Sequence, residues 1–145
     1  MKKSLIILIH CTWGIIQTLC GLVWFVVQTI KRGKIEIEWV GHSFHSIMPG
    51  RSDGVSLGLF SFNGESCEDH LLEQKDIKHE NGHSIQALKY GPLYLIVVGI
   101  PSLINYHNKD LDGYDKQGYR KYYQVWPENN ADKLGGVNLE ERCKK

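Results

Sequence analysis

The sequence has little cysteine and almost no net charge, and each shortage excludes a class of protein. Its four cysteines form no CxxC pair, which argues against a disulfide framework and a cysteine-based metal site and favours a reducing compartment. The 17 Lys and Arg residues nearly balance the 16 Asp and Glu residues, so the formal charge of +1 gives no electrostatic case for nucleic acid as a partner. A chain of 145 residues allows one domain with one modest core.

Charge is missing altogether from residues 4–30, which contain no Asp, Glu, Lys or Arg. This run exceeds the roughly 20 residues with which a helix crosses a bilayer, so we expect residues 1–33 to form an N-terminal transmembrane helix with basic flanks. The basic residues on its two sides nearly balance and do not determine its orientation. Three polar residues inside the run are expected to face protein or a cavity rather than lipid: His10, Gln17 and Gln28.

A cleaved signal sequence is the alternative interpretation of this run. The apolar stretch is longer than a typical signal core, and no A-x-A-like cleavage site ends it. Cleavage of the lipoprotein type before Cys20 would need a small residue where Leu19 stands. We therefore expect a retained helix, which makes membrane lipid a partner and the cell membrane the location.

Alternating residues predict a small antiparallel sheet after the N-terminal helix. Residues 34–40 alternate apolar side chains with Glu36 and Glu38, which is the period of a half-buried strand. Residues 55–62 alternate again, and Asn63-Gly64 closes this second run. The stretch between them is rich in turn residues, so the pattern indicates two or three antiparallel strands.

The period then changes to that of helices. Residues 68–90 have helical spacing, and Gly91-Pro92 ends the helix. The window 90–108 is apolar and uncharged but barely long enough to span a membrane. After a polar loop at residues 107–118, whose acids fail the EF-hand spacing, a short helix is expected from Pro127 to Gly135.

The segment HENGH, residues 79–83, contains the His-Glu-x-x-His spacing of zinc peptidases. On a helix, His79 and His83 lie on one face and can direct both imidazoles at one ion. Glu80 lies beside His79, where its carboxylate can take a proton from a water activated by the metal. The alternative is that His79 and Glu80 are surface residues and His83 is a core histidine.

A second short segment supplies the third ligand that a catalytic zinc site needs. In ENNAD, residues 128–132, Glu128 is the candidate ligand, and Asp132 on the same face can bond the remaining ring nitrogen of a ligand histidine. Gln86 shares the face of His79 and His83 and is a candidate for a similar supporting contact. Otherwise Glu128 is an acid favoured by the helix dipole, Asp132 a solvated residue and Gln86 a plain polar residue.

Together, HENGH and the segment ENNADKLGG resemble the gluzincin class of zinc metallopeptidases, most closely its membrane-bound branch with HExGH and ExxADxxG motifs. The resemblance covers only these two motifs. It implies that an edge strand ahead of the metal helix, here within residues 55–62, holds the substrate backbone by strand addition. The site residues that it implies are the Zn²⁺ ligands His79, His83 and Glu128, the general base Glu80 and the supporting Asp132.

The expected fold is an α+β membrane protein in which residues 34–145 form a single zincin-like domain. If residues 90–108 crossed the membrane once, Glu128 would lie on the opposite side from His79 and His83. Zinc–ligand bonds are only about 2.0–2.2 Å long, so this apolar segment must be re-entrant or buried. Residues 99–101, Gly-Ile-Pro, are the expected point of reversal.

The predicted function is hydrolysis of peptide bonds in a protein or peptide near the membrane, with the zinc site on the cytoplasmic side. The alternative is a non-catalytic membrane protein that acts as an accessory or interaction partner and holds a structural zinc ion or no metal. The residue that would stabilise the transition state stays open among four candidates, for which aromatic packing is the competing role: Tyr119, Tyr122, Tyr123 and His107.

Overall fold

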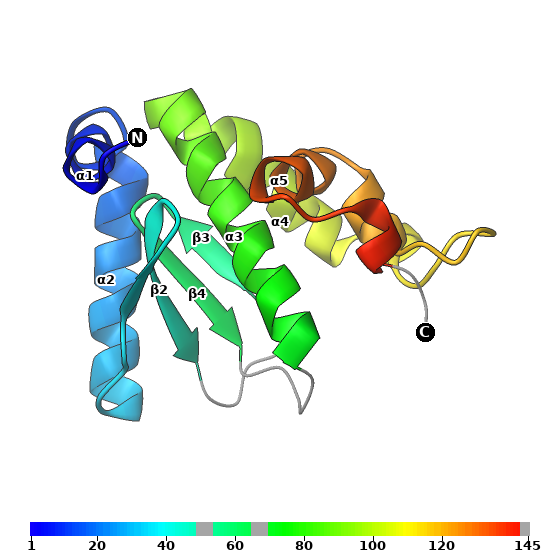
Figure 1. Cartoon of the computed structure of the whole chain (residues 1–145), viewed down its shortest axis with the longest axis horizontal. Coiled ribbons are helices and arrows are strands. Elements are labelled where there is room, and N and C mark those ends of the chain that lie inside the picture. The colour runs from blue at the N-terminus through cyan, green and yellow to red at the C-terminus, as the bar shows by residue number, and fades with distance from the viewer. Residues whose placement is uncertain (49–53, 65–69, 143–145) are drawn as a thin grey trace.

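A four-stranded sheet lies between two helices, with α2 on one face and α3 on the other (Figure 1). The computed structural model describes residues 1–48, 54–64 and 70–142 of this chain. The strands are β1 (Glu38–Val40), β2 (Ser43–Met48), β3 (Val55–Leu57) and β4 (Phe60–Gly64). The main helices are α1 (Lys3–Thr12), α2 (Ile15–Arg32), α3 (His70–Tyr90), α4 (Ile100–His107) and α5 (Glu128–Gly135). The expected α+β class is confirmed.

The sheet is mixed, so the expectation of an antiparallel sheet is wrong. Its strand order is β1-β2-β4-β3, and β2 pairs with β4 in parallel. The run 55–62 is not one strand, because the chain turns at Gly58, with φ of 61°, and β3 and β4 form a hairpin. The second strand of this hairpin pairs with β2, which leaves β3 as an edge strand.

The two faces of the sheet differ in chemistry. Towards α2, aromatic rings pack around Phe60 of β4. The centroid of its ring lies 6.1 Å from those of Phe25 and Phe44 and 6.5 Å from that of Phe62. On the opposite face, the hydroxyl of Ser61 lies 2.7 Å from that of Ser43 and 3.0 Å from that of Ser56. These small polar side chains allow α3 to pack close to the strands, where the Ser84 hydroxyl donates to the carbonyl of Gly58 at 3.0 Å.

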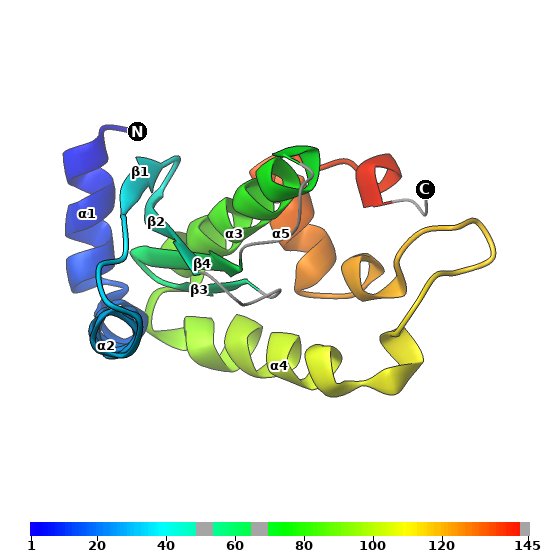
Figure 2. The same ribbon diagram turned by 90° about the horizontal axis from the view of Figure 1, so that it is seen from below.

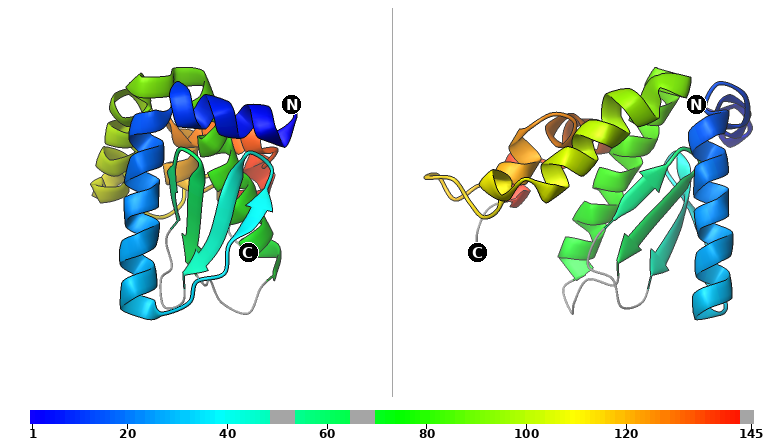
Figure 3. Two further views of the ribbon diagram at one scale, coloured as in Figure 1. Left: turned by 90° about the vertical axis from the view of Figure 1, so that its left-hand side faces the viewer. Right: turned by 180° about the vertical axis from the view of Figure 1, so that it is seen from behind.

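The uncharged N-terminal run is two helices rather than one, because α1 and α2 meet at an angle of 98° (Figure 3). Within the described residues no single helix has both the length and the hydropathy to cross a membrane; the bent pair taken together is long and apolar enough. His10, Gln17 and Gln28 are buried against protein, as expected for polar residues in such a run. Gln17 donates to the carbonyl of Gly91 at 2.9 Å.

Residues 90–108 turn back at their beginning and not at Gly99–Pro101 as expected. The chain reverses at Gly91, with φ of 51°, and runs back beneath α3 towards α5 (Figure 2). A 3₁₀ turn (Gly91–Leu93) and a π-helical turn (Leu95–Gly99) lead into α4. The helix continues through Pro101, and the carbonyl of Val97, four residues before this proline, accepts from the indole of Trp126 at 3.2 Å.

This returning segment is buried on one side only. Tyr94 and Val98 are buried beside Ala87 of α3. Elsewhere it exposes large apolar residues, of which Ile100, Leu103 and Tyr106 line a cavity and Leu93, Ile96 and Ile104 face outwards. The segment thus neither crosses away from α3 nor lies wholly in the core, and it brings the chain back to α5, which begins after Pro127 as predicted.

Candidate metal centre

Helices α3 and α5 cross in close contact, and glycine makes this contact possible. A Cβ atom on Gly82 of α3 would overlap with the carbonyl of Ala131, and one on Gly135 of α5 would overlap with the carbonyl of Lys78. Because both positions lack a side chain, the two backbones approach to the distance at which short side chains can meet. The glycine inside HENGH therefore positions the second motif against the first.

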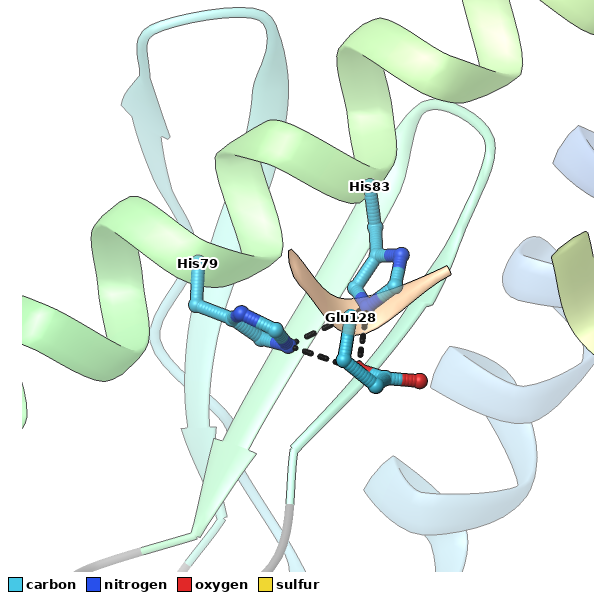
Figure 4. Close-up of side chains that lie close together, drawn as sticks. All are labelled: His79, His83 and Glu128. Carbon is cyan, nitrogen blue, oxygen red and sulfur yellow. Dashed lines mark hydrogen bonds and ion pairs between the residues drawn. The ribbon is translucent and has the colours of Figure 1, made fainter. Parts of the chain in front are cut away.

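Three side chains from these two helices converge on one point (Figure 4). The Nε2 atom of His79 lies 3.1 Å from Nε2 of His83 and 3.1 Å from Oε2 of Glu128. The Nε2 atom of His83 lies 3.2 Å from the same Oε2. All three residues are buried, so this group can hold a metal ion.

The dimensions of this triangle fit a small ion. A tetrahedral ion with bonds of about 2.0–2.1 Å places its ligand atoms roughly 3.3–3.4 Å apart, close to the 3.1–3.2 Å found here. Two imidazole nitrogens and one carboxylate oxygen are ligands that zinc accepts, and three protein ligands leave one position open. The donor set and its geometry therefore suit a metal site with one free position.

Hydrogen bonds determine which ring nitrogens are available. Gln86 donates through Nε2 to the Pro127 carbonyl at 3.1 Å and to Asn130 at 3.0 Å, so its Oε1 accepts from Nδ1 of His83 at 2.8 Å. Asp132 accepts from Nδ1 of His79 at 2.7 Å. With Nδ1 protonated on both rings, each neutral imidazole presents a lone pair on Nε2. Two lone pairs and a carboxylate oxygen this close together require a shared cation or proton.

Arg142 holds Asp132 in this arrangement. Its guanidinium donates two hydrogen bonds to the Asp132 carboxylate, at 2.9 and 3.2 Å, and a third to Asp76 at 3.0 Å. The same group lies 3.7 Å from the ring centroid of Tyr123, which in turn packs edge-to-face on His79. The guanidinium thus bonds both oxygens of Asp132, including the Oδ1 that accepts from His79, and so balances the charge of the buried carboxylate and fixes its orientation.

Electrostatics favour a positive charge at the point of convergence. Burial lowers the pKa of His79, but the hydrogen bonds with Asp132 and Glu128 outweigh burial and raise it to about 9. Burial raises the pKa of Glu128, but hydrogen bonds from His79 and His83 outweigh it and hold the pKa well below its usual range. A metal ion and a proton therefore compete for the same Nε2 of His79.

Glu80 lies next to the three ligand residues and is not one of them. It is 5% exposed, and among the described residues its Oε2 atom has no hydrogen-bond partner. Burial raises the pKa of Glu80, and the charges of His83 and His79 offset part of this rise. A buried carboxylate with a raised pKa and a free oxygen beside a candidate metal site is suited to accept a proton.

Two cavities meet at this site. One, of about 520 Å³, has mainly apolar walls from α2, β3 and the segment 95–107. The other, of about 270 Å³, is polar and lies under residues 105–123. Both are lined by Gly54, His79, Glu80, Tyr106 and Tyr122, so His79 and Glu80 lie at their junction, whereas His83 and Glu128 line only the apolar cavity.

The four candidates for stabilising a transition state lie in different places. Tyr122 lines both cavities, and burial together with the Glu128 charge raises its pKa well above the usual value. His107 lines only the apolar cavity, and Tyr123 lines the polar one while packed between His79 and Arg142. Tyr119 lines neither of these two cavities. A protonated Tyr122 hydroxyl is thus the one of the four that borders the whole junction.

The structure brings together all the residues that the two motifs predicted. His79, His83 and Glu128 converge, Asp132 and Gln86 bond the outer ring nitrogens, and the alternative that His79 and Glu80 are surface residues is wrong. Arg142 was not predicted, because it lies in a short C-terminal stretch with no local pattern to mark it. The glycine of HENGH was a visible signal for close packing, since glycine weakens a helix interior unless contact requires it.

Comparisons with protein-family models, with curated proteins and with solved structures give no significant match to this chain. The class of the site is therefore defined by its own geometry, which is a buried group of two histidines and one glutamate within reach of a single ion.

Proposed function

We propose that this protein is a membrane-anchored zinc metallopeptidase. The observation that carries the proposal is the triangle of His79, His83 and Glu128, open towards two cavities and with Glu80 beside it. A structural zinc site is normally closed by four protein ligands, whereas a catalytic site keeps a position for water or substrate. Three protein ligands that all line a cavity support a catalytic site over a structural one.

Each side chain has a definite role in the proposed hydrolysis. His79, His83 and Glu128 would hold the metal, which supplies a Lewis acid that acidifies water and polarises a carbonyl group. Glu80 accepts the proton of the attacking water on its free carboxylate oxygen and delivers it to the leaving amine. Asp132 and Gln86 keep the imidazoles in the tautomer that presents Nε2.

The edge strand supports a polypeptide as the substrate. Strand β3 lines the apolar cavity with residues Val55–Leu57, and its outer edge is not paired with another described strand. An extended peptide can add to such an edge through main-chain hydrogen bonds. Its scissile bond would then lie near Gly54, whose missing side chain leaves room for the Glu80 carboxylate.

The exposed apolar surface supports a location at the membrane. Large apolar side chains lie exposed along α2 and, on the returning segment, at Leu93, Ile96 and Ile104, which line neither cavity. Monomeric soluble proteins rarely expose apolar patches of this extent, and membrane contact is one explanation for them. We infer that both surfaces contact lipid and that the metal site faces the cytoplasm.

Replacement of Glu80 tests the catalytic role. In Glu80→Gln we expect stoichiometric zinc by atomic absorption and a fall in peptide hydrolysis of about 10²–10⁴-fold, since the proton acceptor is lost and the ligands are kept. The matched control is Glu36→Gln, the same change of acid to amide at an exposed side chain that lines neither cavity, and it should retain full activity. Unchanged hydrolysis in Glu80→Gln would rule out Glu80 as the base. A zinc-bound wild type without activity favours a structural zinc site, and absence of zinc excludes both.

A further inference from the structure

The walls of the two cavities change from polar to apolar in the same direction. On α3, Asp76 lines only the polar cavity, His79 and Glu80 line both, and His83 lines only the apolar one. Seven residues of helix separate Asp76 from His83, which is about 10 Å along the axis. The two cavities together form a channel that follows α3, with His79 and Glu80 at its junction and His83 and Glu128 on the apolar side of it.

The other two walls have the same order. Gly54 borders both cavities, and the strand that follows it, Val55–Leu57, borders only the apolar one. On the returning segment, residues between Leu95 and Leu103 contribute to the apolar cavity, and Leu111–Gly113 border only the polar cavity. The change falls at Tyr106, which borders both cavities, with Asn105 beside it on the polar cavity and His107 on the apolar one. Three elements thus pass from one cavity to the other near the same place.

The chemistry of the two halves is distinct. The apolar half contains residues such as Trp24, Val55, Leu57, Leu95 and Leu103. The polar half contains the charged residues Asp76, Asp112 and Arg120 together with Asn105. An apolar side chain gains free energy only in the first half, and a charged one keeps polar partners only in the second.

Strand β3 gives the channel a direction for a bound peptide. Its chain runs from Gly54 at the junction to Leu57, where the carbonyl of Leu57 lies against Gly21 of α2. Antiparallel pairing is slightly more stable per residue than parallel pairing, so an added strand is expected to run from Leu57 towards Gly54. Its N-terminal part would then lie in the apolar half and its C-terminal part in the polar half.

We propose that the substrate is a polypeptide segment that changes from apolar to polar residues, in the N-to-C direction, at the bond that is cleaved. The proposal rests on the proposed peptidase function and specifies its substrate. The hydroxyl of Tyr94 donates to the carbonyl of Ser56 at 3.0 Å, so one edge carbonyl already has a partner and pairing uses the other main-chain groups of the strand.

Two fluorogenic peptides of identical composition test the proposed substrate preference directly, with the full-length, zinc-loaded protein in detergent. The forward peptide has three apolar residues followed by three polar ones, and the reversed peptide has the opposite order. We expect kcat/KM to be about tenfold or more higher for the forward peptide, the effect of one buried apolar side chain. Mass spectrometry should place the cleavage at the change of polarity.

A pair of adjacent variants tests the apolar half itself. Leu103 and Ile104 are 61% and 62% exposed, but only Leu103 lines the cavity. We expect Leu103→Asp to reduce kcat/KM for the forward peptide about tenfold with zinc content unchanged, and Ile104→Asp to leave it unchanged.

The outcomes separate the two proposals. Equal rates for the two peptides, or a preference for the reversed one, would overturn the polarity of the channel and leave peptidase activity standing. A zinc-loaded protein that cleaves neither peptide overturns both proposals.

Discussion

The contact between α3 and α5 and the contact between α2 and the sheet hold the same molecule together in opposite ways. At the first, backbones touch at Gly82 and Gly135, and polar atoms meet at defined distances of 2.7–3.2 Å. At the second, three phenylalanine rings pack around Phe60 with centroids 6.1 Å or more from its own. A polar contact depends on individual atoms, whereas an apolar one depends on buried area. Substitutions should therefore have much sharper functional effects at the first contact than at the second.

The largest effect is expected where the two backbones touch. In Gly82→Ala the added methyl group overlaps with the Ala131 carbonyl, so α5 must shift and carry Glu128 away from the histidines. We expect zinc affinity, measured by competition with a chromogenic chelator, to fall by roughly two to three orders of magnitude. A loss of this size corresponds to the contribution of one ligand to a zinc-binding free energy of about 10–16 kcal/mol.

Gly99→Ala is the matched control, because a Cβ there would have its nearest neighbour at an ordinary 3.7 Å. It should bind zinc as the wild type does. If Gly82→Ala retained wild-type affinity, the close approach of the helices would not be what positions Glu128.

A smaller effect is expected from the side chain that joins the two helices without touching the ion. Gln86→Met keeps the size of the residue but removes the acceptor for His83 and the donor to the Pro127 carbonyl. The imidazole of His83 then loses its fixed tautomer, and zinc affinity should fall about 10–100-fold by the same competition measurement. Gln86→Glu keeps an acceptor for His83 and should lose less zinc affinity than Gln86→Met. An affinity equal to wild type in Gln86→Met would show that this hydrogen bond has no influence on the metal.

The smallest effect on zinc is expected on the opposite side of the sheet. Phe60→Leu reduces the aromatic packing around Phe25 and Phe62 but changes no group in contact with the metal ligands. Chemical denaturation should show a loss of about 1 kcal/mol in the free energy of unfolding, while zinc affinity stays within about twofold of wild type. A fall in affinity as large as that of Gln86→Met would mean that the two contacts are not independent.

The same contrast explains what the sequence could predict. His79, His83, Glu128 and Asp132 lie in two short helical motifs, and helical geometry alone gives their shared faces. Gln86 follows from the same spacing. Arg142 could not be predicted, because its contacts with Asp76 and Asp132 join residues from three separate segments.

The sheet was harder to predict than the site. Strand β2 escapes the alternation rule because its buried residues include Ser43, His45 and Ser46, which are polar. The run 55–62 alternates like one strand although it contains a hairpin, since the turn at Gly58 has no Asn-Gly or Asp-Gly signature. In the N-terminal run, hydropathy measures composition and not direction, so the 98° bend leaves no trace in it.

The place where the chain reverses at Gly91 has one more consequence, which concerns modularity. Gly91 lies against the ring of Trp13, at the bend between α1 and α2, and its carbonyl accepts a hydrogen bond from Gln17. The N-terminal helices therefore pack against the turn from which the wall of the apolar cavity begins. The composition of the chain changes at residue 33, but the packing continues across it. If residues 1–33 are the membrane anchor that we propose, they cannot be exchanged for another anchor as a linker or a tag can, because they pack against the proposed enzyme.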